Sequence, residues 1–103
     1  MEKRLGCITL ILERQRADVP AVNERISQFS DSVIGRLGLP YPDRGVNIIT
    51  LIVDCTVERL SALTGQLGRL PGIQVKSLMA KEPRPAGGPG AGRSADAPGQ
   101  AAE

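Results

Sequence analysis

The sequence predicts an α+β fold with a four-stranded antiparallel sheet and two helices packed on one face of that sheet. Strand-like apolar runs and helical patterns follow one another in the order strand, helix, strand, strand, helix, strand. In a compact single-sheet domain this order gives the ferredoxin-like βαββαβ fold, and right-handed crossovers place the first and third strands at the centre. Those two runs are also the most apolar of the four, which is the composition that central strands require.

We expect one folded domain at residues 1–81 and a disordered C-terminal tail at residues 82–103. The tail consists mainly of Pro, Gly and Ala and has no aliphatic side chain larger than that of Ala. Such a segment cannot bury enough apolar surface to offset its ordering entropy. The remaining domain is small, and the chain has one Phe, one Tyr and no Trp, so a partner subunit would add to its stability.

The first strand is expected at residues 3–13, and the first helix follows Asp18, which stands at its N-cap position. Pro20 falls in the first turn, where a missing N–H breaks no helical hydrogen bond. Apolar residues then recur at spacings of three, four and three, which places them on one helical face. These residues are Val19, Val22, Ile26 and Phe29.

A second strand, a loop and a third strand follow at residues 32–39, 40–45 and 46–54. Two glycines and an arginine suit the second strand to the edge of a sheet. Strict alternation along it places Val33, Leu37 and Leu39 on one face. The third strand is apolar at nearly every position and suits the centre.

Thr56 is placed to cap the second helix, and Glu58 lies in its first turn, where a carboxylate meets the positive helix end. The apolar face of this helix is formed by leucines at the same spacings, namely Leu60, Leu63, Leu67 and Leu70. Gly65 and Gly68 interrupt the helix, and we interpret them as positions that allow close backbone packing. A Pro–Gly pair ends the helix before a final strand at residues 73–79.

The two central strands are apolar on both faces, although two helices can cover only one face of the sheet. An antiparallel sheet with one face in water normally alternates apolar and polar residues. The apolar residues expected on the face away from the helices are Leu5, Cys7, Ile11, Ile48 and Ile52. Because exposed apolar patches mark interfaces, we expect a homo-oligomer, a dimer or tetramer, formed through this open face or through strand edges.

Charge and composition argue against several classes of function. The net charge is +2 and the arginines are spread along the chain, so we expect no direct nucleic-acid binding, which needs clustered positive charge. The sequence shows no signal peptide and no membrane-spanning run, and its two cysteines form no metal or redox motif. We therefore expect a cytoplasmic protein with reduced thiols and no membrane contact.

No catalytic constellation is visible, and we expect neither an enzyme nor a bound metal or cofactor. His is absent, which removes the commonest general base and every Ser-His or Cys-His pair. Four aspartates stand at the ends of elements, where capping and turns explain them: Asp18, Asp31, Asp43 and Asp54. Cys55 precedes the second helix, so either the helix end lowers the pKa of its thiol or the thiol is buried and inert.

Two strings carry a family resemblance, VIGRLGLPYPDRGVNIITLIVD and LSALTGQLGRLPGIQVKS. They resemble a GR-G-PY segment before a strand and an ALTGKLGRLPGV-like segment before the last strand in the small proteins called iron-only hydrogenase system regulators. The resemblance covers residues 3–80. It implies an ACT-like ferredoxin fold related to the ligand-binding domain of the nickel-responsive repressor, and a regulatory role in the [FeFe]-hydrogenase system.

The chain departs from these relatives in ways that bear on function. The absence of His excludes an imidazole nickel site. The first strand begins near Lys3, which leaves no room for a DNA-binding segment before it, so regulation would pass through a hydrogenase maturation protein or a transcription factor. ACT domains that bind amino acids commonly have a glycine in the loop after the first strand. Residues 14–18 contain none, which argues against amino-acid ligands.

The candidate ligand-binding residues come from the resembling strings: Arg36, Gly38, Tyr41, Arg44, Thr64 and Arg69. Arg36 lies between glycines on an edge strand, so its guanidinium and the backbone can both approach a carboxylate or phosphate. The alternative role for Arg36 is an ion pair across a subunit interface. Beside Thr64 and Arg69, the two helix glycines leave room for a ligand.

Two hypotheses for function follow. The first is a non-enzymatic, ligand-responsive regulatory oligomer of the [FeFe]-hydrogenase system, without its own DNA-binding domain. The alternative is an assembly or adaptor protein that contacts hydrogenase maturation enzymes and binds no small molecule.

Overall fold

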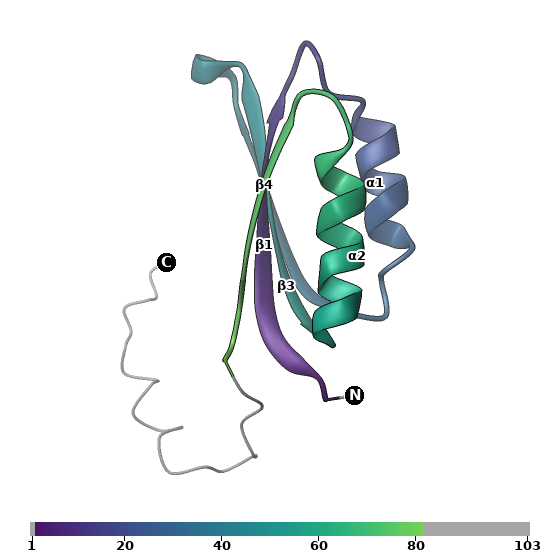
Figure 1. The fold of residues 1–103 in the computed structure, drawn as a ribbon. Helices are drawn as coiled ribbons and strands as arrows, with labels where there is room; N and C mark the ends of the chain where they lie inside the picture. Colours follow the sequence, from purple (N-terminus) through teal and green to yellow (C-terminus); the bar gives the residue numbers. More distant parts are fainter. Residues whose placement is uncertain (1, 82–103) are drawn as a thin grey trace, which may run out of the picture.

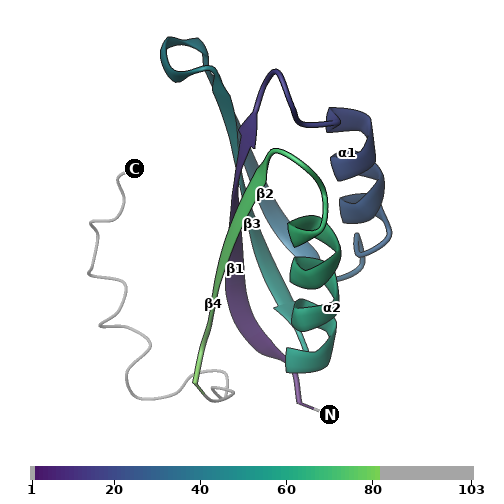
Figure 2. The same ribbon diagram turned by 45° about the horizontal axis from the view of Figure 1, so that its top comes forward.

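The computed structural model describes residues 2–81 and has the α+β, ferredoxin-like architecture that the sequence predicts. The strand order is β2-β3-β1-β4, and every neighbouring pair is antiparallel, so the first and third strands are central as predicted. Helices α1 and α2 cover one face of this sheet (Figures 1 and 2). The elements are β1 (Arg4–Glu13), α1 (Val19–Ser27), β2 (Val33–Tyr41), the 3-10 turn η1 (Pro42–Arg44), β3 (Val46–Cys55), α2 (Val57–Gly68) and β4 (Ile73–Met79). The predicted disordered tail lies outside the described residues.

The hydrophobic core lies between the sheet and the two helices. β1 and β3 pair over their full length, from Arg4 opposite Cys55 to Glu13 opposite Val46. The helix-facing residues of these two strands are almost entirely shielded from solvent: Ile8, Leu10, Leu12, Leu51 and Val53. The helices contribute Val22, Ile26, Leu60, Leu63 and Leu67. The faces that the sequence pattern assigned to the core are therefore confirmed for both helices and both central strands.

Both predicted helix caps are present. The side chain of Asp18 accepts a 3.1 Å hydrogen bond from the backbone N–H of Ala21, and Thr56 accepts one of 3.2 Å from that of Arg59. α1 ends at Ser27, earlier than the apolar spacing indicated. Phe29 is nevertheless buried, because the turn after the helix carries its ring back toward the core.

The strict alternation predicted for β2 is wrong, because the strand carries a β-bulge. Val33 lies opposite Val53, whereas Gly35 lies opposite Ile52, so Ile34 is the extra residue between them. The bulge reverses the side on which the following residues point. Val33 therefore faces the helices, while Leu37, opposite Thr50, points to the other face of the sheet.

The β2–β3 connection is tighter than the loop predicted at residues 40–45. β2 continues to Tyr41, and η1 leads to Gly45, whose φ of 66° is the left-handed conformation that suits glycine. The long β2–β3 hairpin projects beyond the helices at the top of Figure 1.

Gly72, between α2 and β4, is a position where glycine is required. Its φ is 74°, and an added Cβ would lie 2.8 Å from the Cβ of Arg16. The carbonyl of Gly72 also accepts a 2.8 Å hydrogen bond from the N–H of Glu13, which joins this turn to the end of β1.

Gly65 and Gly68 do not serve the close packing that the sequence suggested. Both are exposed, and within the described part of the chain an added Cβ at either position would meet no atom within 4 Å. Their small size therefore has no packing role inside this subunit.

Candidate functional site

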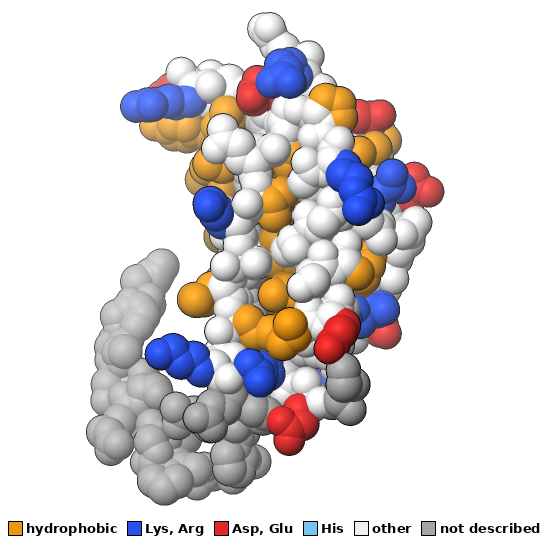
Figure 3. All heavy atoms as spheres, in the orientation of Figure 1, with side chains coloured by type: hydrophobic (Ala, Val, Ile, Leu, Met, Phe, Trp, Pro, Cys, Tyr) orange, Lys and Arg blue, Asp and Glu red, His pale blue; other side chains and the backbone are white. Residues whose placement is uncertain are grey.

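The face of the sheet opposite the helices, called the open face below, is rich in exposed apolar side chains. Pairing places Leu5, Leu37, Leu39, Ile52 and Leu78 on it, and each is between 46% and 70% exposed. Thr9 and Thr50 lie near its centre, with their hydroxyl oxygens 3.2 Å apart. In the view of Figure 3, hydrophobic side chains gather on the helix-free side of the sheet beneath the β2–β3 hairpin.

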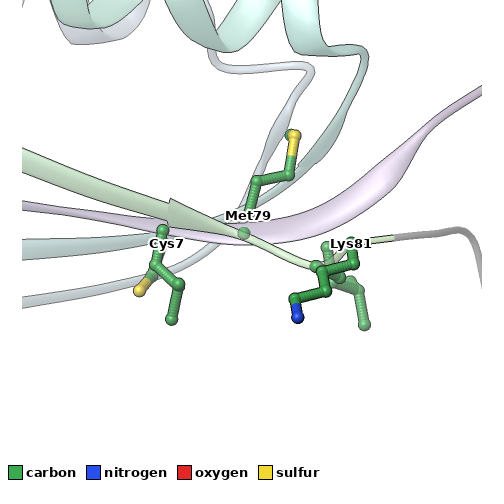
Figure 4. A pocket seen from close by; sticks show the side chains of 7 residues that line it. Cys7, Met79 and Lys81 are labelled. Carbon is green, nitrogen blue, oxygen red and sulfur yellow. The ribbon is translucent and has the colours of Figure 1, made fainter.

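A cavity opens on the open face near the start of β1 and the end of β4. It has a volume of about 490 Å³ and is lined mainly by apolar groups, among them Leu5, Cys7 and Leu78. Figure 4 shows Cys7 and Lys81 on one side of the strands and Met79 pointing the other way, toward the helices. The open face is therefore hollowed at this end rather than flat.

On the opposite side of the sheet, a groove runs between α1 and the edge strand β2. Arg36 projects from β2 on the helix-facing side, opposite Leu51, and one of its amino groups donates a 2.8 Å hydrogen bond to Oδ1 of Asn23 on α1. Cavities of about 170 and 290 Å³ are both lined by these two residues. The groove is defined as these two cavities together, with the Arg36–Asn23 pair common to both.

The larger of the two cavities is lined by α1, the turn after it and the start of β2, including Ile26, Ser30 and Val33. The smaller cavity lies toward the hairpin, and its helix-side apolar lining comes from β1, α1 and β3: Leu12, Val19 and Ile49. Gly38 lines it as well, and within residues 2–81 a Cβ added there would meet no atom within 4 Å. The smaller cavity therefore has mainly apolar walls, the larger one has a mixed lining that includes Ser27 and Ser30, and Arg36 lines both.

Asn47 also lines the smaller cavity. It lies opposite Leu12, on the helix-facing side of β3, and its Oδ1 is shielded from solvent. Among the described residues that oxygen has no hydrogen-bond partner. Buried polar atoms are usually paired, and an unpaired one costs about 1–3 kcal/mol. Asn47 is thus a strained polar position in the wall of the smaller cavity rather than a group open to a ligand.

Of the six predicted ligand residues, the structure brings two together in the groove, Arg36 and Gly38. Tyr41 and Arg44 lie at the tip of the β2–β3 hairpin, and Tyr41 is paired with Val46 on the open face. Thr64 lies in α2, and Arg69 is the C-cap residue directly after that helix. The hydroxyl of Thr64 donates to the carbonyl of Ser61 within that helix, and Arg69 lines a separate polar hollow together with Arg25 and Gln66.

Sequence reasoning missed Asn23 and Asn47 as groove residues. A signal for Asn47 is present in the sequence, since it occupies the helix-facing register of β3 that Ile49 and Leu51 continue. A polar residue at such a position needs a partner. Asn23 shows no comparable signal, because an exposed asparagine on a helix is ordinary and its contact depends on where β2 lies.

Arg59 is a second residue that the sequence did not single out. From α2 its Nε donates a 2.7 Å hydrogen bond to the buried hydroxyl of Ser32, and its amino group lies 2.6 Å from a carboxylate oxygen of Asp31. Its guanidinium also lies 4.7 Å from the centre of the Phe29 ring, within reach of a cation–π interaction. Arg59 therefore fastens the turn between α1 and β2 to α2.

The structure decides between the two readings of Cys55. Burial raises the pKa of the Cys55 thiol above its ordinary value of 9.0, and the positive charge of Arg59 opposes this rise without cancelling it. The thiol is thus protonated at neutral pH and buried in the core, which is the inert alternative.

The described residues contain no group of three or more His, Cys, Asp or Glu side chains placed to hold a metal ion. Within the same range, neither helix is long and apolar enough to cross a membrane.

Taken together, the sheet order and the helices on one face define a small ferredoxin-like α+β domain. Residues 4–77 match the model of the family described as "TM1266-like: Iron-only hydrogenase system regulator, putative". The chain belongs to this family, as the resemblance in its sequence indicated. Its name designates a regulator of the iron-only hydrogenase system.

Among solved structures, the chain is similar to the uncharacterized protein TM1266 from Thermotoga maritima, with a TM-score of 0.74 and 31% sequence identity. The match covers 78% of this chain and 100% of that chain. A comparison with curated proteins finds no match.

Proposed function

We propose that this protein is a non-enzymatic, ligand-responsive oligomer that acts in regulation of the iron-only hydrogenase system. The family it belongs to carries that regulatory role in its name. The rest of the proposal is supported by two features on opposite sides of one sheet. One is the exposed apolar open face, and the other is the groove beside Arg36.

The open face supports self-association. Residues such as Leu37 and Leu78 are about 70% exposed, although burying an apolar side chain of this size is worth about 1.5–3 kcal/mol. A second copy that packs its own open face against this one would remove both sets of side chains from water. The core strands β1 and β3 form the centre of both the open face and the hydrophobic core, so such an interface would also support the small domain itself.

The groove supports ligand binding. Within residues 2–81 no carboxylate pairs with Arg36, whose recorded partner is the neutral amide of Asn23. A guanidinium without an acidic partner beside apolar walls is suited to an anionic ligand. Because one strand layer separates the groove from the open face, a ligand that moves β2 would also alter the surface offered to a second subunit.

Thermal-shift screening tests ligand responsiveness. The full chain would be screened against organic acids, nucleotides, S-adenosylmethionine and metal ions, with Gly38→Phe as the blocked-groove variant and Gly65→Ala as its matched control. We expect at least one compound to raise the melting temperature of the wild-type and Gly65→Ala chains by several degrees. The same compound should leave Gly38→Phe unshifted, since the added ring would occupy the smaller cavity.

The open face also fits a different protein, which is the adaptor alternative. If no compound shifts the melt while a hydrogenase maturation enzyme co-purifies with the chain, ligand responsiveness is overturned and the adaptor function takes its place. Substitution of Leu37 by Glu should then abolish the co-purification, because that side chain lies on the open face.

A further inference from the structure

We propose that two copies of the chain pair through their open faces so that the β2–β3 hairpin of each copy fills the open-face cavity of the other. The ring of Tyr41 would enter that cavity beside Leu5 and Leu78 of the second copy. This inference rests on the proposed self-association, and it names the residues that each copy contributes.

The hairpin and the cavity lie at diagonally opposite corners of the open face. Tyr41 belongs to edge strand β2 and pairs with Val46 at the hairpin end of the sheet. The cavity lies at the other end of the strands, toward the opposite edge, where Cys7 of β1 pairs with Leu78 of β4. A two-fold axis that lies in the interface and runs perpendicular to this diagonal exchanges the two corners. Two-fold interfaces are the commonest in oligomers, and each contact in them is made twice.

The exposed apolar side chains of the open face divide into two groups along the same diagonal. Each is between 44% and 70% exposed. The group on β2 is Leu37, Leu39 and Tyr41, and the group on the other three strands is Leu5, Ile52 and Leu78. The exchange places Leu37 over Ile52 and Leu39 over Cys7 of the second copy, so both groups leave water together. Thr9 and Thr50 lie between the groups, near the axis.

The shapes of the two corners also fit each other. The hairpin projects beyond the helices, and its tip leans to the helix-free side of the sheet in both views (Figures 1 and 2). The cavity has a volume of about 490 Å³ and a mainly apolar lining, with Lys81 as its charged member. A buried tyrosine ring needs apolar walls, and its hydroxyl usually needs a hydrogen-bond partner. The cavity offers both to Tyr41.

Charge does not oppose this contact. The hairpin tip carries one residue of each sign, Asp43 and Arg44. The cavity end of the open face also carries one of each, Lys81 and Asp54, the latter exposed and paired with Leu5. Two copies therefore meet there without net repulsion, and each charge of one copy has an opposite charge available in the other.

Disulfide trapping in the full chain tests the arrangement, because Cys7 already lines the cavity. Leu39→Cys would add a thiol that lies over Cys7 of the second copy. Within one copy, Leu39 is in register with Ile48 and Ile11, and Ile11 lies about 13 Å along β1 from Cys7. A disulfide needs Cα atoms within about 7 Å of each other. A bond between positions 39 and 7 can therefore form only between two folded copies.

With oxidised glutathione as the oxidant, we expect Leu39→Cys to give a covalent dimer on a non-reducing gel. Peptide mass spectrometry should locate the bond between position 39 and Cys7, and adding Cys7→Ser should abolish it. Ser61→Cys, on the exposed side of α2, has the same number of thiols and should give no bond to Cys7. A Leu39→Cys chain that forms no such bond, or that bonds to a host protein in its place, would overturn the pairing.

A second variant measures what the tyrosine contributes. Tyr41→Ala should weaken dimerisation at least about tenfold in sedimentation, since aromatic anchors in pockets often dominate an interface. Ser61→Ala should leave the dimerisation constant unchanged. Equal dimerisation of Tyr41→Ala and the wild type would show that the ring does not occupy the cavity.

The pairing and the proposed function fail in different ways. If the wild-type chain is a dimer that Leu37→Glu breaks, while Leu39→Cys gives no bond to Cys7, this pairing is wrong and self-association through the open face stands. If the wild-type chain is a monomer, the self-association itself is overturned, and this inference with it.

Discussion

The guanidinium of Arg36 in edge strand β2 donates a 2.8 Å hydrogen bond to the side-chain oxygen of Asn23 in α1. The bond spans the groove between the strand and the helix, and it separates two cavities that both residues line. It also holds in place, without neutralising it, the cationic side chain that the described lining of the groove contains. Ligand binding at this point would compete with, or extend, a contact that joins β2 to the rest of the domain.

The Arg36–Asn23 bond should contribute modestly to stability. In a double-mutant cycle with Arg36→Gln and Asn23→Ala, we expect a coupling free energy of about 0.5–1 kcal/mol, because both side chains are exposed. Urea unfolding of the four chains measures it. Ser61→Ala on α2, combined with Arg36→Gln, serves as the uncoupled control. A coupling of zero for Arg36 and Asn23 would show that the bond does not persist in solution.

Arg59 should contribute more to the free energy of unfolding than its ion pair with Asp31 alone would supply. Arg59→Ala leaves the buried hydroxyl of Ser32 unpaired and removes the guanidinium from the Phe29 ring, so we expect a loss of about 2–3 kcal/mol in the free energy of unfolding. Asp31→Asn should cost less than about 1 kcal/mol, since the aspartate side chain is 76% exposed. Similar losses for the two variants in urea unfolding would contradict the conclusion that Arg59 holds the turn between α1 and β2 to α2.

The burial of the Cys55 thiol leads us to expect a fall in the free energy of unfolding at alkaline pH. Burial raises the pKa of its thiol in the folded protein above the ordinary 9.0, so the folded state holds the proton more tightly than the unfolded chain does. The resulting contribution to the free energy of unfolding is fully present below pH 9.0, the pKa in the unfolded chain. It is lost as the pH rises through the higher pKa of the folded state. Unfolding free energies from pH 7.5 to 10.5 should therefore fall more steeply for the wild type than for Cys55→Ala. Parallel curves for the two chains would show that the thiol is not buried as described.

Two glycines should respond in opposite directions to the same substitution. Gly72→Ala forces an alanine into a φ of 74° and brings its Cβ within 2.8 Å of Arg16, so we expect a loss of at least about 2 kcal/mol. Gly65→Ala lies in an exposed stretch of α2 and meets no described atom within 4 Å, so helix propensity should raise stability by up to about 1 kcal/mol. Thermal unfolding of both variants gives the comparison, and a stabilised Gly72→Ala would contradict the turn geometry.

The sequence was sufficient for the order of elements, the central strands and both helix caps, because each depends on local periodicity or on one capping side chain. It was misleading for β2, where the bulge at Ile34 changes the face of every later residue without any local signal. For Gly65 and Gly68 the inference of close packing was wrong, because a glycine in a helix does not reveal what lies beside it.

The candidate site was harder to predict than the fold. Arg36 could be selected because it stands between glycines in an edge strand, but its partner Asn23 comes from a helix 13 positions away. Of the other predicted residues, Tyr41, Arg44, Thr64 and Arg69 are not among the residues that line the groove with Arg36, and their role as ligand residues stays a prediction. Contacts between elements depend on how the helices and strands are placed relative to one another, which a single sequence does not specify.

The role of the open face is tested most directly by sedimentation equilibrium of the full chain at micromolar concentration. We expect a dimer or larger species relative to the 10.9 kDa monomer. Leu37→Glu, at the centre of the exposed apolar side chains of β2, should convert it to a monomer, whereas Ser61→Glu on the exposed side of α2 should not. A wild-type chain that sediments as a monomer, both at full length and when truncated after Lys81, would contradict the proposal that this face is an interface between two copies.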